Sequence, residues 1–518
     1  MASGEVPAHS GPAPASDARP PAELRRGVVG CGGMLFQSIT FMAPAIATAF
    51  AIPIGIAFGG GATVMAVILA LIASLFVASS IGQLAKHMPS AGSFYTYVSN
   101  GIHPGLGFLV GWTFELALLI GGAFLATQIG IIVSGTLNSE FSTPASLWWV
   151  WMVLGTIMVF TLGYLGIRAS TRAGVLLGAF EVLVILALAI TLIAKAGSHN
   201  TLSVFSTQFA NNPKYRGFPG IIAASVFSIL AFIGFEEAAP LAEEARHPRR
   251  HVRLAVLLSC LSVGLFYVLN TYASTVFFGP RRMLGFVSAG SANPWQNVLA
   301  RDAWGAAGFV IVFLALLNSV IANLNAANNS STRTLYALGR IRLLPSSFAL
   351  LTKRSGSPYM GLWAQMLITI GVSLWLGLQY TPYTAFALIA TILVDVAVPL
   401  YILLNLACIV YFARFRRDEF NWLLHGLIPV LGIAAFIPAF FAGAGIPVFS
   451  FITPLPSPLS YAGPAVGAWV VIGLIYLAYL YARHPQRIVE TRRVFIPEEQ
   501  PPVGAGSARS GGTPETTS

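Results

Sequence analysis

Long apolar stretches alternate with short polar segments from about residue 34 to residue 482. A helix needs about 20 mostly apolar residues to cross a bilayer, and twelve stretches approach or exceed this length. They cover residues 34–58, 62–85, 105–134, 147–167, 173–196, 220–241, 253–278, 304–335, 361–379, 383–412, 423–443 and 464–482. The pattern therefore predicts an all-α polytopic membrane protein with about 12 transmembrane helices.

The two ends of the chain differ from this apolar region. Residues 1–33 are rich in Ala, Pro and Ser and contain no apolar core of a cleavable signal peptide, so we expect the first span to direct insertion. Residues 483–518 end in a polar tail rich in Pro, Gly and Ser, which is typical of disorder. We expect one transmembrane domain over residues 34–482 between two disordered tails.

Composition excludes several classes of protein. Hydrophobic residues make up 56% of the 518 residues and charged residues only 9%, whereas a soluble domain carries about a quarter charged residues. Too few charges remain to coat a water-facing surface, so a soluble enzyme is excluded. The three cysteines, Cys31, Cys260 and Cys408, have no metal or redox spacing. The eight histidines lie in loops, in the tails or near helix ends, and we expect neither a cofactor nor a metal.

The net charge of +11 is explained by topology. Twelve spans place both termini on one side, and only six of the 29 Lys and Arg residues then lie on the other side: Lys195, Lys214, Arg216, Arg281, Arg282 and Arg301. An excess of cations marks the cytoplasmic side. We therefore expect both termini in the cytoplasm of a cell-membrane protein that contacts the lipid bilayer and binds no nucleic acid.

Two spans contain helix-breaking residues near their middle. The first span has Pro44, and the sixth has Gly234 followed by Glu236, Glu237 and Pro240. Proline removes a backbone donor, and freed backbone groups persist in a membrane only beside protein or a water-filled cavity. The two breaks correspond if the first ten spans form two inverted five-helix repeats, 34–196 and 220–412, with spans 423–482 added. Paired breaks of this kind indicate a transporter's central site.

Three motifs resemble the amino acid–polyamine–organocation superfamily of permeases. Residues Gln83 to Trp112 are similar to its P-x-x-G-x-x-Y pattern and following G-W. Residues Phe232 to Arg250 (FIGFEEAAPLAEEARHPRR) resemble F-x-G-F-E with a loop E-E-x-x-x-P-x-R. Residues Asn328 to Pro345 resemble S-x-R-x-x-x-A-x-x-R-x-x-x-x-P. The likeness covers about residues 28–415, although MAPAIA (Met42 to Ala47) replaces the G-x-G stretch of many relatives.

The resemblance implies a leucine-transporter-like fold and a substrate site at the two breaks. Backbone N–H groups at the first break suit a carboxylate, and carbonyls at the second suit an ammonium group. Gly234 would leave room for the substrate, and Phe232 would act as a gate. The implied substrate-binding residues are Ala43, Pro44, Ala45, Ile46, Ala47, Ala231, Phe232, Ile233 and Gly234. Close helix packing through small residues also explains the alanines.

Acidic residues within spans are costly and usually functional. Glu236 stands where the family carries a glutamate beside the break, so it is a candidate for proton coupling or a structural acceptor of freed N–H groups. Glu115 and Glu181 are single acids among apolar neighbours. Each is a candidate proton relay or an interhelical hydrogen-bond partner.

The sequence therefore predicts a secondary active transporter, not an enzyme. Its substrates would be amino acids or related organic amines, and its driving force a proton gradient or exchange. Two alternatives stay open, a transporter-like amino acid sensor and a sodium-coupled transporter that uses Thr40 or Thr48 with Ser319. Apolar residues around the first break favour a neutral or apolar side chain on the substrate. Either a monomer or a homodimer is compatible with the sequence.

Overall fold

The computed structural model describes residues 29–483, apart from 91, 166–170, 290–292, 341–343 and 353–354. The predicted tails, 1–33 and 483–518, lie almost wholly outside the described residues. Helix α1 begins at Cys31, three residues before the expected start of the first span.

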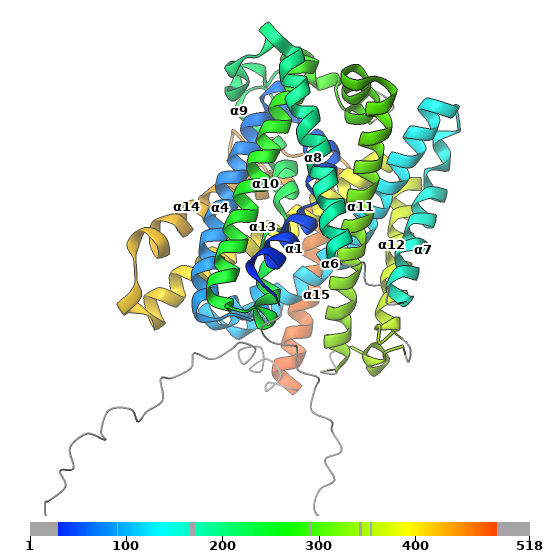
Figure 1. Cartoon of the computed structure of the whole chain (residues 1–518). Coiled ribbons are helices and arrows are strands. Elements are labelled where there is room, and N and C mark those ends of the chain that lie inside the picture. The colour runs from blue at the N-terminus through cyan, green and yellow to red at the C-terminus, as the bar shows by residue number, and fades with distance from the viewer. Residues whose placement is uncertain are drawn as a thin grey trace, which may run out of the picture.

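The described chain is a bundle of long helices with nearly aligned axes (Figure 1). Eleven helical stretches are long and apolar enough to cross a membrane. The helices are α1 (Cys31–Met42), α2 (Pro44–Ile46), α3 (Ile52–Gly59), α4 (Thr63–His87), α5 (Ser93–Gly101), α6 (Pro104–Phe141), α7 (Trp148–Leu165), α8 (Thr171–Ala196), α9 (Phe218–Phe232), α10 (Pro248–Phe278), α11 (Arg301–Arg340), α12 (Tyr359–Gln379), α13 (Pro382–Phe415), α14 (Ile428–Gly443) and α15 (Ala462–Arg483).

The first helical stretch contains two of the twelve predicted spans. It runs without a loop over Cys31–His87, 57 residues, which as a straight helix would measure about 85 Å. No bilayer is that thick. The chain turns at Gly60, where φ is 55° and ψ is −139°, and α4 begins three residues later and packs against α9 and α10. A side chain at Gly60 would meet Asn211 Oδ1 at 2.6 Å.

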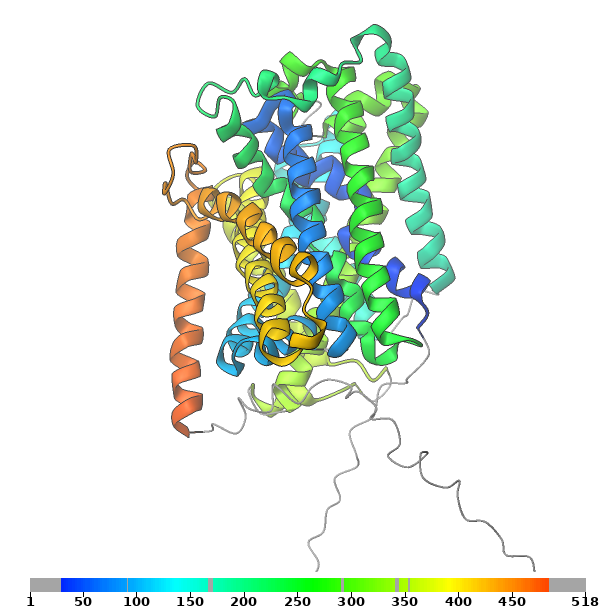
Figure 2. The ribbon, with the colours of Figure 1, turned by 90° about the vertical axis from the view of Figure 1, so that its left-hand side faces the viewer.

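Helix packing leaves an apolar outer surface. Helix α6 lies against α11, α12 and α13, while α10 packs along α4. Large apolar side chains such as those of Leu176, Trp375 and Leu378 point outward and are about 70% exposed. Because apolar surface is stable only away from water, this perimeter faces lipid. Helices α14 and α15 lie at one side of the bundle (Figure 2).

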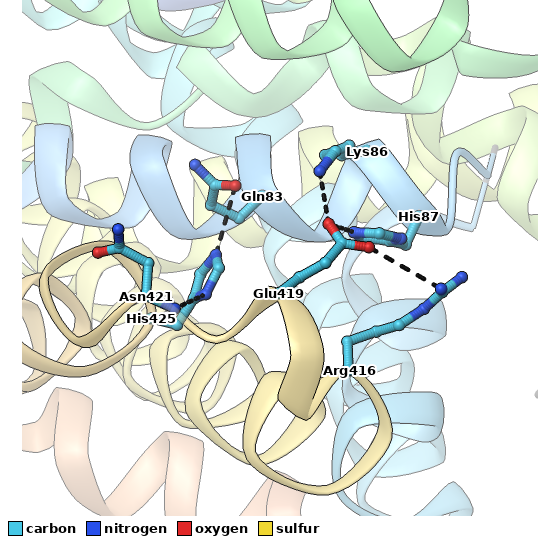
Figure 3. A network of polar contacts seen from close by, with 7 residues as sticks. All are labelled: Gln83, Lys86, His87, Arg416, Glu419, Asn421 and His425. Atoms are coloured by element: carbon cyan, nitrogen blue, oxygen red, sulfur yellow. Dashed lines mark hydrogen bonds and ion pairs between the residues drawn. The ribbon is translucent and has the colours of Figure 1, made fainter.

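A polar network joins one end of α4 to the connection between α13 and α14 (Figure 3). Lys86 Nζ lies 2.6 Å from Glu419 Oε2, and His87 Nε2 lies 3.3 Å from the same oxygen. Beside them, the His425 ring stacks on Phe412 with centroids 3.5 Å apart. The hydrogen bond from Lys86 holds the pKa of the Glu419 carboxyl below its ordinary value.

Glu419→Gln should lower thermal stability slightly, because it removes the carboxylate that lies beside Lys86, His87 and Arg416. A depressed pKa in the folded state contributes stability above the ordinary pKa of about 4.3 and loses it as pH falls through the lower, folded-state pKa. The Lys86–Glu419 ion pair is partly exposed, so the variant should lose less than about 1 kcal/mol of the free energy of unfolding. Thermal unfolding in detergent should show the parent and the variant converging as pH falls from 6 to about 3. Asp418→Asn, at the exposed neighbouring acid, is the control. A difference that persists in acid would contradict this assignment.

Candidate functional site

A cavity of about 100 Å³ lies between the two broken helices and the faces of α6, α11 and α13. Its walls are mainly apolar and include Phe124 and Leu125 from α6 and Val396 and Leu400 from α13. The polar side chains at its surface are those of Gln128, Glu236, Glu237, Asn323 and Tyr401. The cavity can therefore enclose a small solute that has both an apolar part and a polar group.

The first break lies where the sequence predicted it. Helix α1 ends at Met42, Ala43 adopts a left-handed conformation with φ of 45°, and α2 begins at Pro44. Pro44 lacks a backbone N–H, so the first turn of α2 presents those of Ala45 and Ile46. Ile46 N–H donates to Ser319 Oγ at 3.4 Å.

The second break follows α9. This helix ends at Phe232, Gly234 takes a φ of 116°, and the chain continues as the 3-10 segment η7 (Phe235–Glu244), which contains Pro240. Five of the nine predicted substrate-binding residues line the cavity: Ala43, Ile46, Ala47, Ala231 and Ile233. The other four, Pro44, Ala45, Phe232 and Gly234, are not among its lining residues.

Gly234 allows the two breaks to cross at close range. A Cβ atom at this position would lie 2.7 Å from Phe41 Cδ1 and 3.1 Å from Met42 N. The space beside Gly234 is therefore occupied by α1 in this structure and is not part of the cavity. Its positive φ adds a second requirement for glycine.

Two hydroxyl groups tie the breaks together. Ser38 Oγ of α1 donates to Phe235 O at 2.8 Å and accepts from Ala238 N–H at 2.9 Å. Tyr267 Oη of α10 lies 3.0 Å from Met42 O and 2.8 Å from Ala231 O. Ser38 thus pairs with two backbone groups of the second break, while the one proton of the Tyr267 hydroxyl is within reach of a carbonyl from each broken helix. Sequence reasoning missed Tyr267, since a lone tyrosine in an apolar span carries no distinctive signal.

Phe232, the predicted gate, packs away from the cavity. Its side chain is fully buried, and its ring lies edge-on to Tyr267 with centroids 5.4 Å apart. The aromatic residues at the cavity surface are instead Phe41, Phe94, Phe114, Phe124 and Tyr401.

The buried acids that were predicted to carry protons differ in their partners. Glu236 accepts from Gly234 N–H at 3.0 Å and from Tyr401 Oη at 2.9 Å. Glu181 of α8 accepts from Asn318 Nδ2 at 2.9 Å and from Ser319 Oγ at 3.1 Å, so it joins α8 to α11. Glu115 of α6 is buried, and its oxygens have no hydrogen-bond partner among the described residues.

Glu237 is the acidic lining residue that the sequence analysis did not single out. Its side chain is 7% exposed and borders the cavity. The pair of adjacent glutamates was the only sequence signal, and it does not show which of the two faces the cavity.

The comparisons with known proteins agree with this architecture. The amino acid permease family matches residues 33–485. The chain is 26% identical to the histidine permease HisP of Lactococcus lactis over 57% of this chain and 61% of that protein. It is 25% identical to the branched-chain amino acid permease BcaP of L. lactis, over 82% and 88%. It is 28% identical to human cationic amino acid transporter 4, over 68% and 54%.

The helical bundle with a central cavity at two broken helices is the architecture of a multi-pass membrane carrier. The family match covers nearly the whole chain, so the chain belongs to the amino acid permease family. The matched part spans less than two thirds of the histidine permease and of transporter 4.

Gly234→Ala should destabilise the protein by about 1–3 kcal/mol, because it forces an alanine into a positive-φ position and against the backbone of Met42. A fall in thermal unfolding temperature in detergent measures the effect. Gly371→Ala in α12 is the control, since a Cβ there meets nothing within 4 Å. Equal unfolding temperatures for Gly234→Ala and the parent would show that the breaks do not cross this closely.

Proposed function

We propose that this permease is a secondary active transporter of amino acids or related organic amines. The observation that carries the proposal is the cavity at two broken helices, where backbone and side-chain polar groups converge. The names of the relatives, which denote histidine, branched-chain and cationic amino acid permeases, support this substrate class.

Transport would proceed by alternating access. The bundle formed by α1–α4, α9, η7 and α10 rocks against a scaffold formed by α6, α7, α11 and α12. Ser38 and Tyr267 keep the two breaks together as the bundle moves, because their bonds lie wholly within it. Phe232 acts as the gate only if its ring turns away from Tyr267 toward the cavity during this motion. Both termini lie in the cytoplasm, as the distribution of Lys and Arg indicates.

Substrate binding would use the backbone at both breaks. The N–H group of Ala45, at the start of the helix after the first break, suits an anionic group, whereas that of Ile46 already donates to Ser319 Oγ. At the second break, Ala231 O already accepts from Tyr267, and a carbonyl with two lone pairs retains room for one more donor. Ala43 and Ala47 admit the solute close to the chain, because neither projects a large side chain.

Coupling to protons would depend on Glu236. Its carboxyl borders the cavity and binds both Gly234 N–H and Tyr401 Oη. Protonation removes one acceptor position, so it loosens the second break and changes the link from η7 to α13. Glu181 would relay the protonation change to the first break. Its carboxyl accepts from Ser319 Oγ, which in turn accepts from Ile46 N–H. Glu115 has no such connection to the breaks among the described residues.

Glu236→Gln should retain exchange but lose accumulation driven by a proton gradient, because an amide keeps the shape of the side chain and cannot carry a proton. Proteoliposomes loaded with unlabelled amino acid measure exchange, and an imposed inward proton gradient measures accumulation. Glu115→Gln and Glu181→Gln are tested in parallel. Equal gradient-driven uptake by Glu236→Gln and the parent would remove Glu236 from coupling. Binding without any flux in the parent would indicate a sensor.

A further inference from the structure

The cavity contains one carboxyl group for which the protein supplies no partner. Both oxygens of Glu236 are bound, to Gly234 N–H and to Tyr401 Oη. The neighbouring Glu237 is equally part of the cavity wall, yet its carboxyl makes no hydrogen bond and no ion pair with any described residue. The two acids therefore have different tasks, although they are adjacent in the chain.

Because Glu237 is buried, the lack of a partner for its carboxyl group has an energetic cost. Glu237 is 7% exposed, and a buried carboxylate without a partner is strongly destabilised relative to water. Glu236 increases the cost, because two adjacent carboxylates repel each other. Neither Lys, Arg nor His lines the cavity in the part of the chain that the structure describes. A cation that enters the cavity is therefore the missing partner.

The rest of the cavity fits a cation on an alkyl chain. Ala117, Leu118 and Gly121 from α6 and Leu393 and Ala397 from α13 form a wall without charge, against which methylene groups can pack. By contrast, a carboxylate finds few donors. Pro44 lacks an N–H, and Ile46 N–H already binds Ser319. Recognition is therefore stronger for positive than for negative groups.

We infer that Glu237 binds the ammonium group of an organic cation, and that this permease selects net-cationic alkylamines over neutral amino acids. This inference rests on the proposed transport function and names the substrate class of the same cavity. It differs from the sequence-based expectation of a neutral or apolar substrate side chain, which considered only the first break. The shared chemistry is an alkylammonium group, which occurs both in diamines and in amino acids with a cationic side chain.

The test uses the full-length protein in proteoliposomes preloaded with unlabelled substrate, with labelled putrescine, lysine and leucine as probes. The parent should exchange putrescine or lysine with a KM at least about tenfold below that for leucine. Glu237→Gln should raise the KM for the cations about tenfold or more, while kcat stays within about twofold. Exchange of putrescine but not of lysine would indicate that the substrates are amines without a carboxylate. Exchange of lysine but not of putrescine would indicate that the substrates are cationic amino acids.

Two further variants keep the result interpretable. Glu237→Asp retains the charge and should restore part of the affinity for the cations. Asp395→Asn alters another buried carboxyl without partners among the described residues, one that does not line the cavity, and it should leave KM unchanged. If Glu237→Gln does not fold, the Asp variant and the stabilisation of the parent against heat by putrescine, with leucine as comparison, decide the question.

Different experimental results would contradict the role of Glu237 and the proposed transport function. Exchange of leucine in preference to both cations, or an unchanged KM in Glu237→Gln, overturns the role of Glu237 and leaves transport intact. Absence of exchange of all three probes by the parent overturns the transport proposal itself.

Discussion

Backbone groups that a broken helix leaves unpaired have no water to bind within a bilayer, and this constraint determines the centre of the molecule. The chain meets it by bringing two breaks against each other. Gly234 lets the second break approach Met42, Ser38 binds both Phe235 O and Ala238 N–H, and Tyr267 reaches a carbonyl of each broken helix. These donors and acceptors all belong to the protein itself. The cavity beside them is a consequence of the same crossing.

The buried acids illustrate how environment separates identical side chains. Glu236 is held by a backbone N–H and a tyrosine hydroxyl, and Glu181 by an amide and a serine on the neighbouring helix. Glu237 borders the same cavity as Glu236 but is bound by no described side chain. A carboxyl that is already hydrogen-bonded stabilises the fold or links helices, whereas an unpartnered one is available to a solute. The proposed roles of Glu236 in coupling and of Glu237 in recognition rest on this difference in partners.

Much of the fold could be predicted because the bilayer imposes simple rules on the sequence. Helix α12 at Tyr359–Gln379 matches the expected 361–379 within two residues, whereas α6 continues to Phe141, seven residues beyond the expected end at residue 134. The first two spans appear as one helical stretch, since a single glycine, Gly60, is enough to reverse the chain there. The candidate site was predicted less completely. Phe232 stands at the break as expected, but its ring faces Tyr267, because side-chain direction depends on a helix that is distant in sequence.

By itself, the sequence determined the membrane class and the positions of both breaks. These depend on hydropathy, on the missing N–H of proline and on the freedom of glycine, all of which are local properties. Only the tertiary structure decided which backbone groups are already bound and which carboxyl is left to the cavity. Tyr401 lies 165 residues from Glu236, and no local rule connects them. The distinction between Glu236 and Glu237 therefore arises only when α13 packs against η7.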